Sequence, residues 1–106
     1  MPSAKRTKLQ LEHGLMHIAL HAPVSAHRKL AMRYLGNADI LFAYAVARNV
    51  SISDAELQDI DSHIQNAQIQ TENNKFKNAL KCYRTALSAL PGLPGWVPPT
   101  IPPVPD

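Results

Sequence analysis

The sequence has few of the residues that build covalently or metal-stabilised folds. Among its 106 residues, Cys82 is the only cysteine, so the chain can form neither an internal disulfide nor a zinc site made from cysteines. A lone thiol is typical of a reducing compartment, and we expect a cytoplasmic protein. The four glycines do not form the Gly-rich loop that binds phosphates in nucleotide-binding proteins. These absences exclude disulfide scaffolds and P-loop proteins.

Long hydrophobic runs are also lacking. The longest is ILFAYAVA, residues 40–47, which is well short of the roughly 18 residues that a membrane-spanning helix needs. The basic start, MPSAKRTK, is typical of a signal peptide, but Glu12 and three histidines interrupt the segment that follows. The sequence therefore predicts neither a membrane span nor a secretion signal.

Strand signals and strong charge are missing as well. No stretch alternates apolar and polar residues with β-branched enrichment, so we predict no β-strand. Apolar residues make up 45% of the chain and charged residues 18%, which is typical of a folded domain. The net charge of +3 is mild compared with that of dedicated nucleic-acid binders. One small helical domain is the class that remains.

Apolar residues at intervals of three and four predict a helical chain. The clearest stripe lies in the last helix and consists of Phe76, Ala79, Leu80, Tyr83, Ala86, Leu87 and Leu90. The expected helices span roughly residues 7–22, 25–49, 53–71 and 75–90. Short connections between helices favour antiparallel neighbours. We therefore predict an all-α fold, a small antiparallel bundle of about four helices.

Start and stop signals support these helix limits. Pro23 ends the first helix, and Ser25 is a suitable cap for the second. Ser53 and Glu56 have the spacing of a capping box at the start of the third. Gly14 is expected to weaken the first helix by up to about 1 kcal/mol relative to alanine.

Composition divides the chain into three parts. We expect a disordered N-terminus at residues 1–6 and the bundle at residues 7–90. Seven of the last sixteen residues are proline, so residues 91–106 are predicted to be a disordered tail, a linker or a polyproline II ligand for another protein. The polar run TENNK, residues 71–75, is expected to make the turn between the last two helices. Without that turn they would merge into one long helix that needs a partner to cover it.

The last helix carries aromatic and small residues in a particular order, followed by a proline. These residues are Phe76, Ala79, Tyr83, Ala86 and Pro91. Residues 58–91 resemble a single tetratricopeptide-like helical hairpin, although only Ala67 fits the family pattern in the first half. His63, Asn66 and Gln70 stand where the family usually has tryptophan, leucine and tyrosine. The resemblance implies a scaffold that presents a surface to a peptide, whereas packing in any antiparallel bundle would select the same residues.

No residue set predicts catalysis. Paired carboxylates and a Ser–His–Asp arrangement are absent from the sequence pattern, and Cys82 has no predictable base. We expect a protein that is not an enzyme and that uses no cofactor. The predicted function is a protein-interaction module, an adaptor, chaperone-like or effector domain, which binds another protein through the first two helices or the edge of the last hairpin. The candidate partner-binding residues are Phe42, Tyr44, Lys77, Lys81, Tyr83 and Arg84.

Two other partner classes stay open. A homodimer would hide residues 40–47 if one chain cannot cover them together with the stripe of the last helix. A basic bundle that binds nucleic acid would require two of the three basic groups to come together, so that they contact phosphates without reading sequence. The groups are Lys5, Arg6 and Lys8; Arg28, Lys29 and Arg33; and Lys77, Lys81 and Arg84.

A histidine row suggests a third function. His13, His17 and His21 stand four residues apart on the first expected helix, so neighbouring imidazoles face nearly the same way. Such a row is a candidate metal site, with His27, His63 or solvent as further ligands, or a pH-responsive surface. A row of solvated histidines without any ligand is the simpler interpretation.

Overall fold

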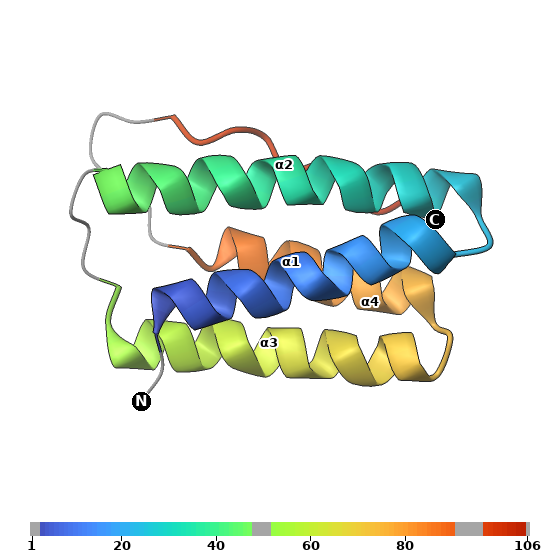
Figure 1. Cartoon of the computed structure of the whole chain (residues 1–106), viewed down its shortest axis with the longest axis horizontal. Coiled ribbons are helices and arrows are strands. Elements are labelled where there is room, and N and C mark those ends of the chain that lie inside the picture. Colours follow the sequence, from blue (N-terminus) through green and yellow to red (C-terminus); the bar gives the residue numbers. More distant parts are fainter. Residues whose placement is uncertain (1–2, 48–51, 91–96, 106) are drawn as a thin grey trace.

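Four helices account for most of the described chain (Figure 1). In this computed structural model, the described residues are 3–47, 52–90 and 97–105. The helices are α1 (Ala4–His21), α2 (Ser25–Ala47), α3 (Asp54–Glu72) and α4 (Phe76–Ser88). No β-strand occurs within those ranges, and the predicted all-α bundle is confirmed.

The helices form two antiparallel hairpins. The closest pairs are α1 with α2 and α3 with α4, and the hairpins meet where α1 lies in front of α4, between α2 on one side and α3 on the other (Figure 1). The core between them consists of aliphatic side chains and the rings of Tyr34, Phe42 and Tyr83. None of the helices in the described part of the chain is long and apolar enough to cross a lipid bilayer.

The first helix begins earlier than predicted. It starts at Ala4 rather than Thr7, because the Ser3 hydroxyl accepts a hydrogen bond from the backbone N–H of Arg6 at 3.1 Å. Thr7 is buried, and its hydroxyl donates to a carboxylate oxygen of Asp61 in α3 at 2.8 Å. The prediction of disorder over residues 1–6 is therefore wrong for residues 3–6. Sequence reasoning overlooked the capping serine.

The limits of the third helix confirm two predicted signals. Ser53 and Glu56 form the capping box, with both reciprocal hydrogen bonds present. At the other end Asn74 takes a left-handed conformation, with φ 59°. The N–H of Asn74 bonds to Thr71 O at 2.9 Å and that of Lys75 to Gln70 O at 2.8 Å, the pair that defines a Schellman motif. The chain turns within TENNK, so α3 and α4 are separate helices.

One contact between the hairpins depends on a glycine. Gly14 lies in the middle of α1, and the ring of Tyr83 from α4 packs directly against its backbone. A Cβ atom added at Gly14 would lie 2.6 Å from Tyr83 Cζ and closer still to the hydroxyl oxygen. No side chain fits in that space. The glycine expected to weaken α1 is thus the residue that lets the second hairpin approach it.

We predict opposite effects for alanine at the two helical glycines. Gly14→Ala should lower the free energy of unfolding by about 1–3 kcal/mol, because it overpacks the contact with Tyr83. Gly36→Ala is the matched control, since a Cβ there meets nothing within 4 Å, and it should raise stability by roughly 0.5–1 kcal/mol. Urea denaturation followed by circular dichroism measures both changes. Tyr83→Phe should recover part of the loss in the Gly14→Ala background. Equal effects at both glycines would refute the contact.

Candidate interaction surfaces

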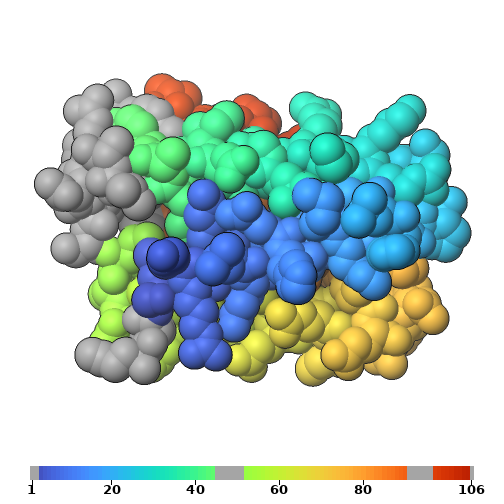
Figure 2. Space-filling view, viewed as in Figure 1, coloured from blue at the N-terminus to red at the C-terminus, as the bar shows by residue number. Residues whose placement is uncertain are grey.

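Large apolar side chains lie on the solvent side of the first hairpin. On α1, Leu9 and Leu20 are 58% and 66% exposed, and they stand on the side of the helix opposite the buried residues Leu11, Leu15 and Ile18. This apolar surface, called the α1–α2 outer face here, consists of Leu9, Met16, Leu20, Met32 and Ile40. Figure 2 shows α1 and α2 meeting along the face toward the viewer.

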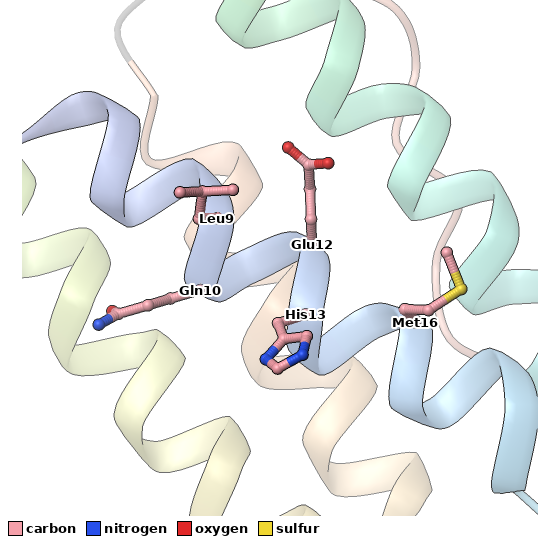
Figure 3. A pocket seen from close by; sticks show the side chains of 5 residues that line it. All are labelled: Leu9, Gln10, Glu12, His13 and Met16. Carbon is pink, nitrogen blue, oxygen red and sulfur yellow. The ribbon is translucent and has the colours of Figure 1, made fainter.

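A shallow depression lies on the α1 part of this surface. Its volume is about 480 Å³, and all the residues that line it come from α1 (Figure 3). They are Leu9, Gln10, Glu12, His13 and Met16. A site for a small molecule normally gathers polar groups from several elements, whereas this one is a mainly apolar strip along one helix. Its shape suits contact with another protein better than enclosure of a ligand.

Charged residues border the outer face. Lys8 lies 3.5 Å from a carboxylate oxygen of Glu12 and 3.5 Å from one of Asp39, so it connects α1 with α2 next to the apolar strip. The side chain of Asp39 is 65% exposed, and such pairs contribute little to stability. The three side chains place charge beside the apolar side chains of α1, a combination that is common at protein interfaces.

A second depression lies between α1 and the α3–α4 turn. Its volume is about 520 Å³, and its lining is more polar. The lining residues are Gln10, His13, Gly14, His17, Gln68, Thr71, Glu72, Asn74 and Tyr83. The Tyr83 hydroxyl is buried here without a hydrogen bond of acceptable geometry among the described residues. Burial raises the pKa of Tyr83, and the side chain of Thr71 opposes part of that rise. The Thr71 hydroxyl itself donates a hydrogen bond to Ala67 O at 2.8 Å.

The histidine row is only partly assembled into a cluster. The rings of His17 and His21 have centroids 4.7 Å apart and are tilted by 44°. His63 instead lies 3.6 Å from Asp59 on its own helix. In residues 3–47, 52–90 and 97–105, no group of three or more His, Cys, Asp or Glu side chains is placed to hold a metal ion. Within the described residues, the row therefore provides one pair of neighbouring imidazoles and no group of three ligands.

The six predicted partner-binding residues do not form one surface. Phe42 is 3% exposed and Tyr83 is fully buried, so the prediction is wrong for these two side chains, which belong to stripes that face the core. Tyr44 and Lys77 are half-buried, and Lys81 is exposed. Tyr44 belongs to the run at residues 40–47, in which Ile40 is exposed and Leu41 is buried. Residues 45–47 belong to α2, and their side chains lie outside the described part of the structure.

Arg84, the last of the six, contacts the end of the chain. Residues 97–105, called the tail segment here, run as an extended trace beside α2 (Figure 1). The Tyr34 hydroxyl donates to Pro102 O at 2.5 Å. The Arg84 guanidinium donates to the same oxygen at 3.2 Å and to Ile101 O at 3.4 Å. Tyr34 belongs to α2 and Arg84 to α4, so the tail segment lies along the seam between these helices.

Apolar packing accompanies these hydrogen bonds. Ile101 and Val104 pack against the core while remaining partly exposed. Burial raises the pKa of Tyr34 to about 12, and the positive charges of Arg84 and then Arg33 oppose part of that rise. The prediction of a disordered tail is not met for residues 97–105, because two aliphatic side chains and two carbonyls find partners on the bundle. Residues 91–96 lie outside the described chain.

One residue from each of two predicted basic groups opposes the rise that burial causes in the pKa of Tyr34. Both Arg33 and Arg84 influence the Tyr34 hydroxyl electrostatically, which joins a residue of the α2 group with one of the α4 group. Arg28 instead donates to Ala22 O at 2.7 Å. Lys8 is paired with acidic residues. Arg28, Arg84 and Lys8, one from each basic group, are thus engaged in separate local contacts.

The single cysteine joins the two helices of the second hairpin. The Asn66 amide nitrogen donates to Cys82 Sγ at 3.4 Å, and burial raises the pKa of the thiol. A raised pKa keeps the thiol protonated near neutral pH, whereas nucleophilic cysteines are thiolates. Its position favours a packing role.

Comparison of the chain with protein-family models, with curated proteins and with solved structures found no match. The tetratricopeptide resemblance thus receives no support from a family model. Ala67, Ala79 and Ala86 are nevertheless fully buried, as close packing of paired helices requires.

Sequence reasoning missed the seam between α2 and α4. It singled out Arg84 but not Tyr34, and it treated the prolines near the end as a sign of disorder alone. The available signal was Ile101 and Val104, two aliphatic residues that break the run of prolines. Apolar side chains in a tail gain free energy when the bundle offers a place to bury them.

We predict that stability falls at alkaline pH because of two tyrosines. Burial raises the pKa values of Tyr34 and Tyr83 from 10.0 to about 12 in the folded chain, so the unfolded chain loses these protons first. The free energy of unfolding should therefore decrease as the pH rises from 10 to 12. Urea denaturation over this range measures the slope, which should be smaller in the Tyr34→Phe, Tyr83→Phe double variant. Ultraviolet titration of the folded protein follows tyrosine ionisation directly. Ionisation of every tyrosine near pH 10 would contradict the prediction.

Proposed function

We propose that this protein is a protein-interaction module that binds a partner protein through the α1–α2 outer face. The observation that carries the proposal is the exposure of five large apolar side chains on one hairpin. Isolated exposed apolar residues are common on folded proteins, whereas Leu9 and Met16 line one apolar depression together, as expected of a contact surface. Leu9, Met16 and Leu20 recur at intervals of seven and four along α1, a spacing that presents them to the same side.

The composition of this face fits a helical or flat partner surface. Two methionines stand among its members, and their flexible side chains adapt to different partners. The charged side chains of Lys8, Glu12 and Asp39 would determine the orientation of a bound partner more than the affinity for it. Adaptor, chaperone-like and effector domains all use surfaces of this kind. A tetratricopeptide-like role for the second hairpin belongs to the same class of function.

Charge placed on the outer face should weaken partner capture. We expect the Leu9→Glu, Leu20→Glu variant of the full chain to lose at least about tenfold in affinity, because truncated or charged hot-spot positions cost more than about 1 kcal/mol each. The measurement is affinity capture from cell extract with quantitative mass spectrometry, followed by titration of each specifically retained protein. The melting temperature should stay within a few degrees, since both residues are exposed.

A matched control variant is available on the second hairpin. Ile69 is 54% exposed on α3, so Ile69→Glu places one glutamate at an exposed apolar position outside the outer face and should leave capture unchanged. Retention of the same proteins by wild type and by the Leu9→Glu, Leu20→Glu variant would refute the proposal. Sedimentation at several concentrations adds a test of the homodimer, in which a second copy covers the face. A dimer that dissociates in the same variant would identify that copy as the partner.

Nucleic-acid binding is the alternative proposal, and the approach of Arg33 and Arg84 to one hydroxyl is the observation that favours it. Retention on heparin that weakens steeply with salt would support it. The metal- or pH-responsive alternative has the His17–His21 pair as its support. A rise in melting temperature with Zn²⁺ or Ni²⁺ that His17→Ala removes would support that function.

A further inference from the structure

The seam between α2 and α4 contacts the tail segment in a chemically specific way. In the described chain, three hydrogen bonds join this segment to the helices, and a tail carbonyl is the acceptor in every one. The donors are the Tyr34 hydroxyl and the Arg84 guanidinium. Arginine has no acceptor atom at all. The seam therefore contacts an extended chain through its carbonyl oxygens.

Proline-containing segments match this arrangement. Proline has no backbone N–H, so its carbonyl is its only backbone polar group. Five of the nine residues from 97 to 105 are proline, and Pro102 O accepts from both donors. A seam that donates hydrogen bonds and buries aliphatic side chains satisfies the carbonyls of such a segment. Proline also restricts the free chain, so less conformational entropy is lost when it is ordered.

The pattern of burial identifies the tail residues that the seam contacts. Pro99, Ile101, Pro102 and Val104 are partly buried, whereas their neighbours at 98, 100, 103 and 105 are exposed. Ile101 and Val104 pack against core residues, and Pro102 supplies the shared acceptor. The seam contacts Ile101, Pro102 and Val104, so the segment that fills it has the sequence aliphatic-Pro-Pro-aliphatic, in which the second proline faces solvent.

We propose that the α2–α4 seam is a binding site for extended proline-containing peptides of a partner protein, with the form aliphatic-Pro-Pro-aliphatic. The chain's own tail segment occupies this site and competes with the partner. The site is separate from the α1–α2 outer face, so it goes beyond the proposed function and adds a second surface with a defined class of ligand.

Competition from the tail segment lowers the apparent affinity of the seam for an added peptide. A segment tethered by a short linker has an effective concentration on the order of millimolar. For a peptide with an intrinsic Kd of about 100 μM, the tethered segment would occupy the seam roughly 90% of the time and weaken binding of an added peptide about tenfold. Displacing the tail should therefore reveal the site.

The test uses the full chain with a weakened tail. Ile101→Asp, Val104→Asp places two charges on the residues that pack against the core, and should release the tail while the helices remain intact by circular dichroism. The probe is a fluorescent peptide with the sequence VPPTIPPVP, residues 97–105. Fluorescence anisotropy should show binding about tenfold tighter to the released variant than to wild type. The same peptide with aspartate in place of its isoleucine and last valine should not bind.

Substitutions in the seam give the specificity test. In the released variant, Tyr34→Phe and Arg84→Gln should each weaken peptide binding roughly fivefold, because each removes donors to the tail carbonyls. Tyr83→Phe and Arg6→Gln are the matched controls. They make the same chemical changes at a buried tyrosine and an exposed arginine that donate no side-chain hydrogen bond to the tail segment, and they should leave peptide binding unchanged.

Three results would overturn the proposal. They are absence of peptide binding by the folded released variant, equal binding by the seam variants and their controls, and a concentration-dependent wild-type dimer that excess peptide dissociates. The last would assign the seam to the tail of a second copy. The titration contains no other protein, so its failure leaves the outer-face proposal intact, and a failed capture experiment leaves the seam proposal intact.

Discussion

The contact between Tyr83 and the bare backbone of Gly14 holds the two hairpins in register. The hairpins pack through α1 against α3 and through α2 against α4, and α1 and α4 also approach each other across the middle of the bundle. A tyrosine from α4 fills the space that a missing side chain leaves on α1. Its hydroxyl is buried without a hydrogen bond of good geometry in the described chain.

This central contact explains why surfaces are left uncovered on both sides of the bundle. With α1 and α4 in the middle, α2 and α3 lie on opposite sides and each has neighbours on only part of its circumference. The seam between α2 and α4 receives Ile101 and Val104 from the tail segment. The solvent side of α1 and α2 receives nothing from the described chain and keeps large apolar side chains in water. Small bundles have too little chain to cover all their apolar surface.

Predictions based on local signals were met, and those that required knowledge of neighbours were not. The capping box at Ser53 and the turn at Asn74 follow from interactions within six residues, so the sequence suffices to place them. The sequence placed Tyr83 on the apolar stripe of α4, which is correct. It was also named as a partner-binding residue, whereas its side chain is buried. Arg84 was expected to contact a partner protein or phosphates, whereas the structure brings its guanidinium to the tail carbonyls. The spacing of residues along a helix defines its faces without defining what each face meets.

From the amino-acid sequence alone follow the helical class, the four helices and their antiparallel connections, because apolar periodicity, caps and turns act over a few residues. The tertiary structure alone decided that Gly14 is a packing site, that the tail segment lies along α2 and α4, and that the outer face of the first hairpin stays exposed. Each of these depends on residues far apart in the chain, such as Gly14 with Tyr83 and Tyr34 with Pro102. Their proximity arises only when the helices pack.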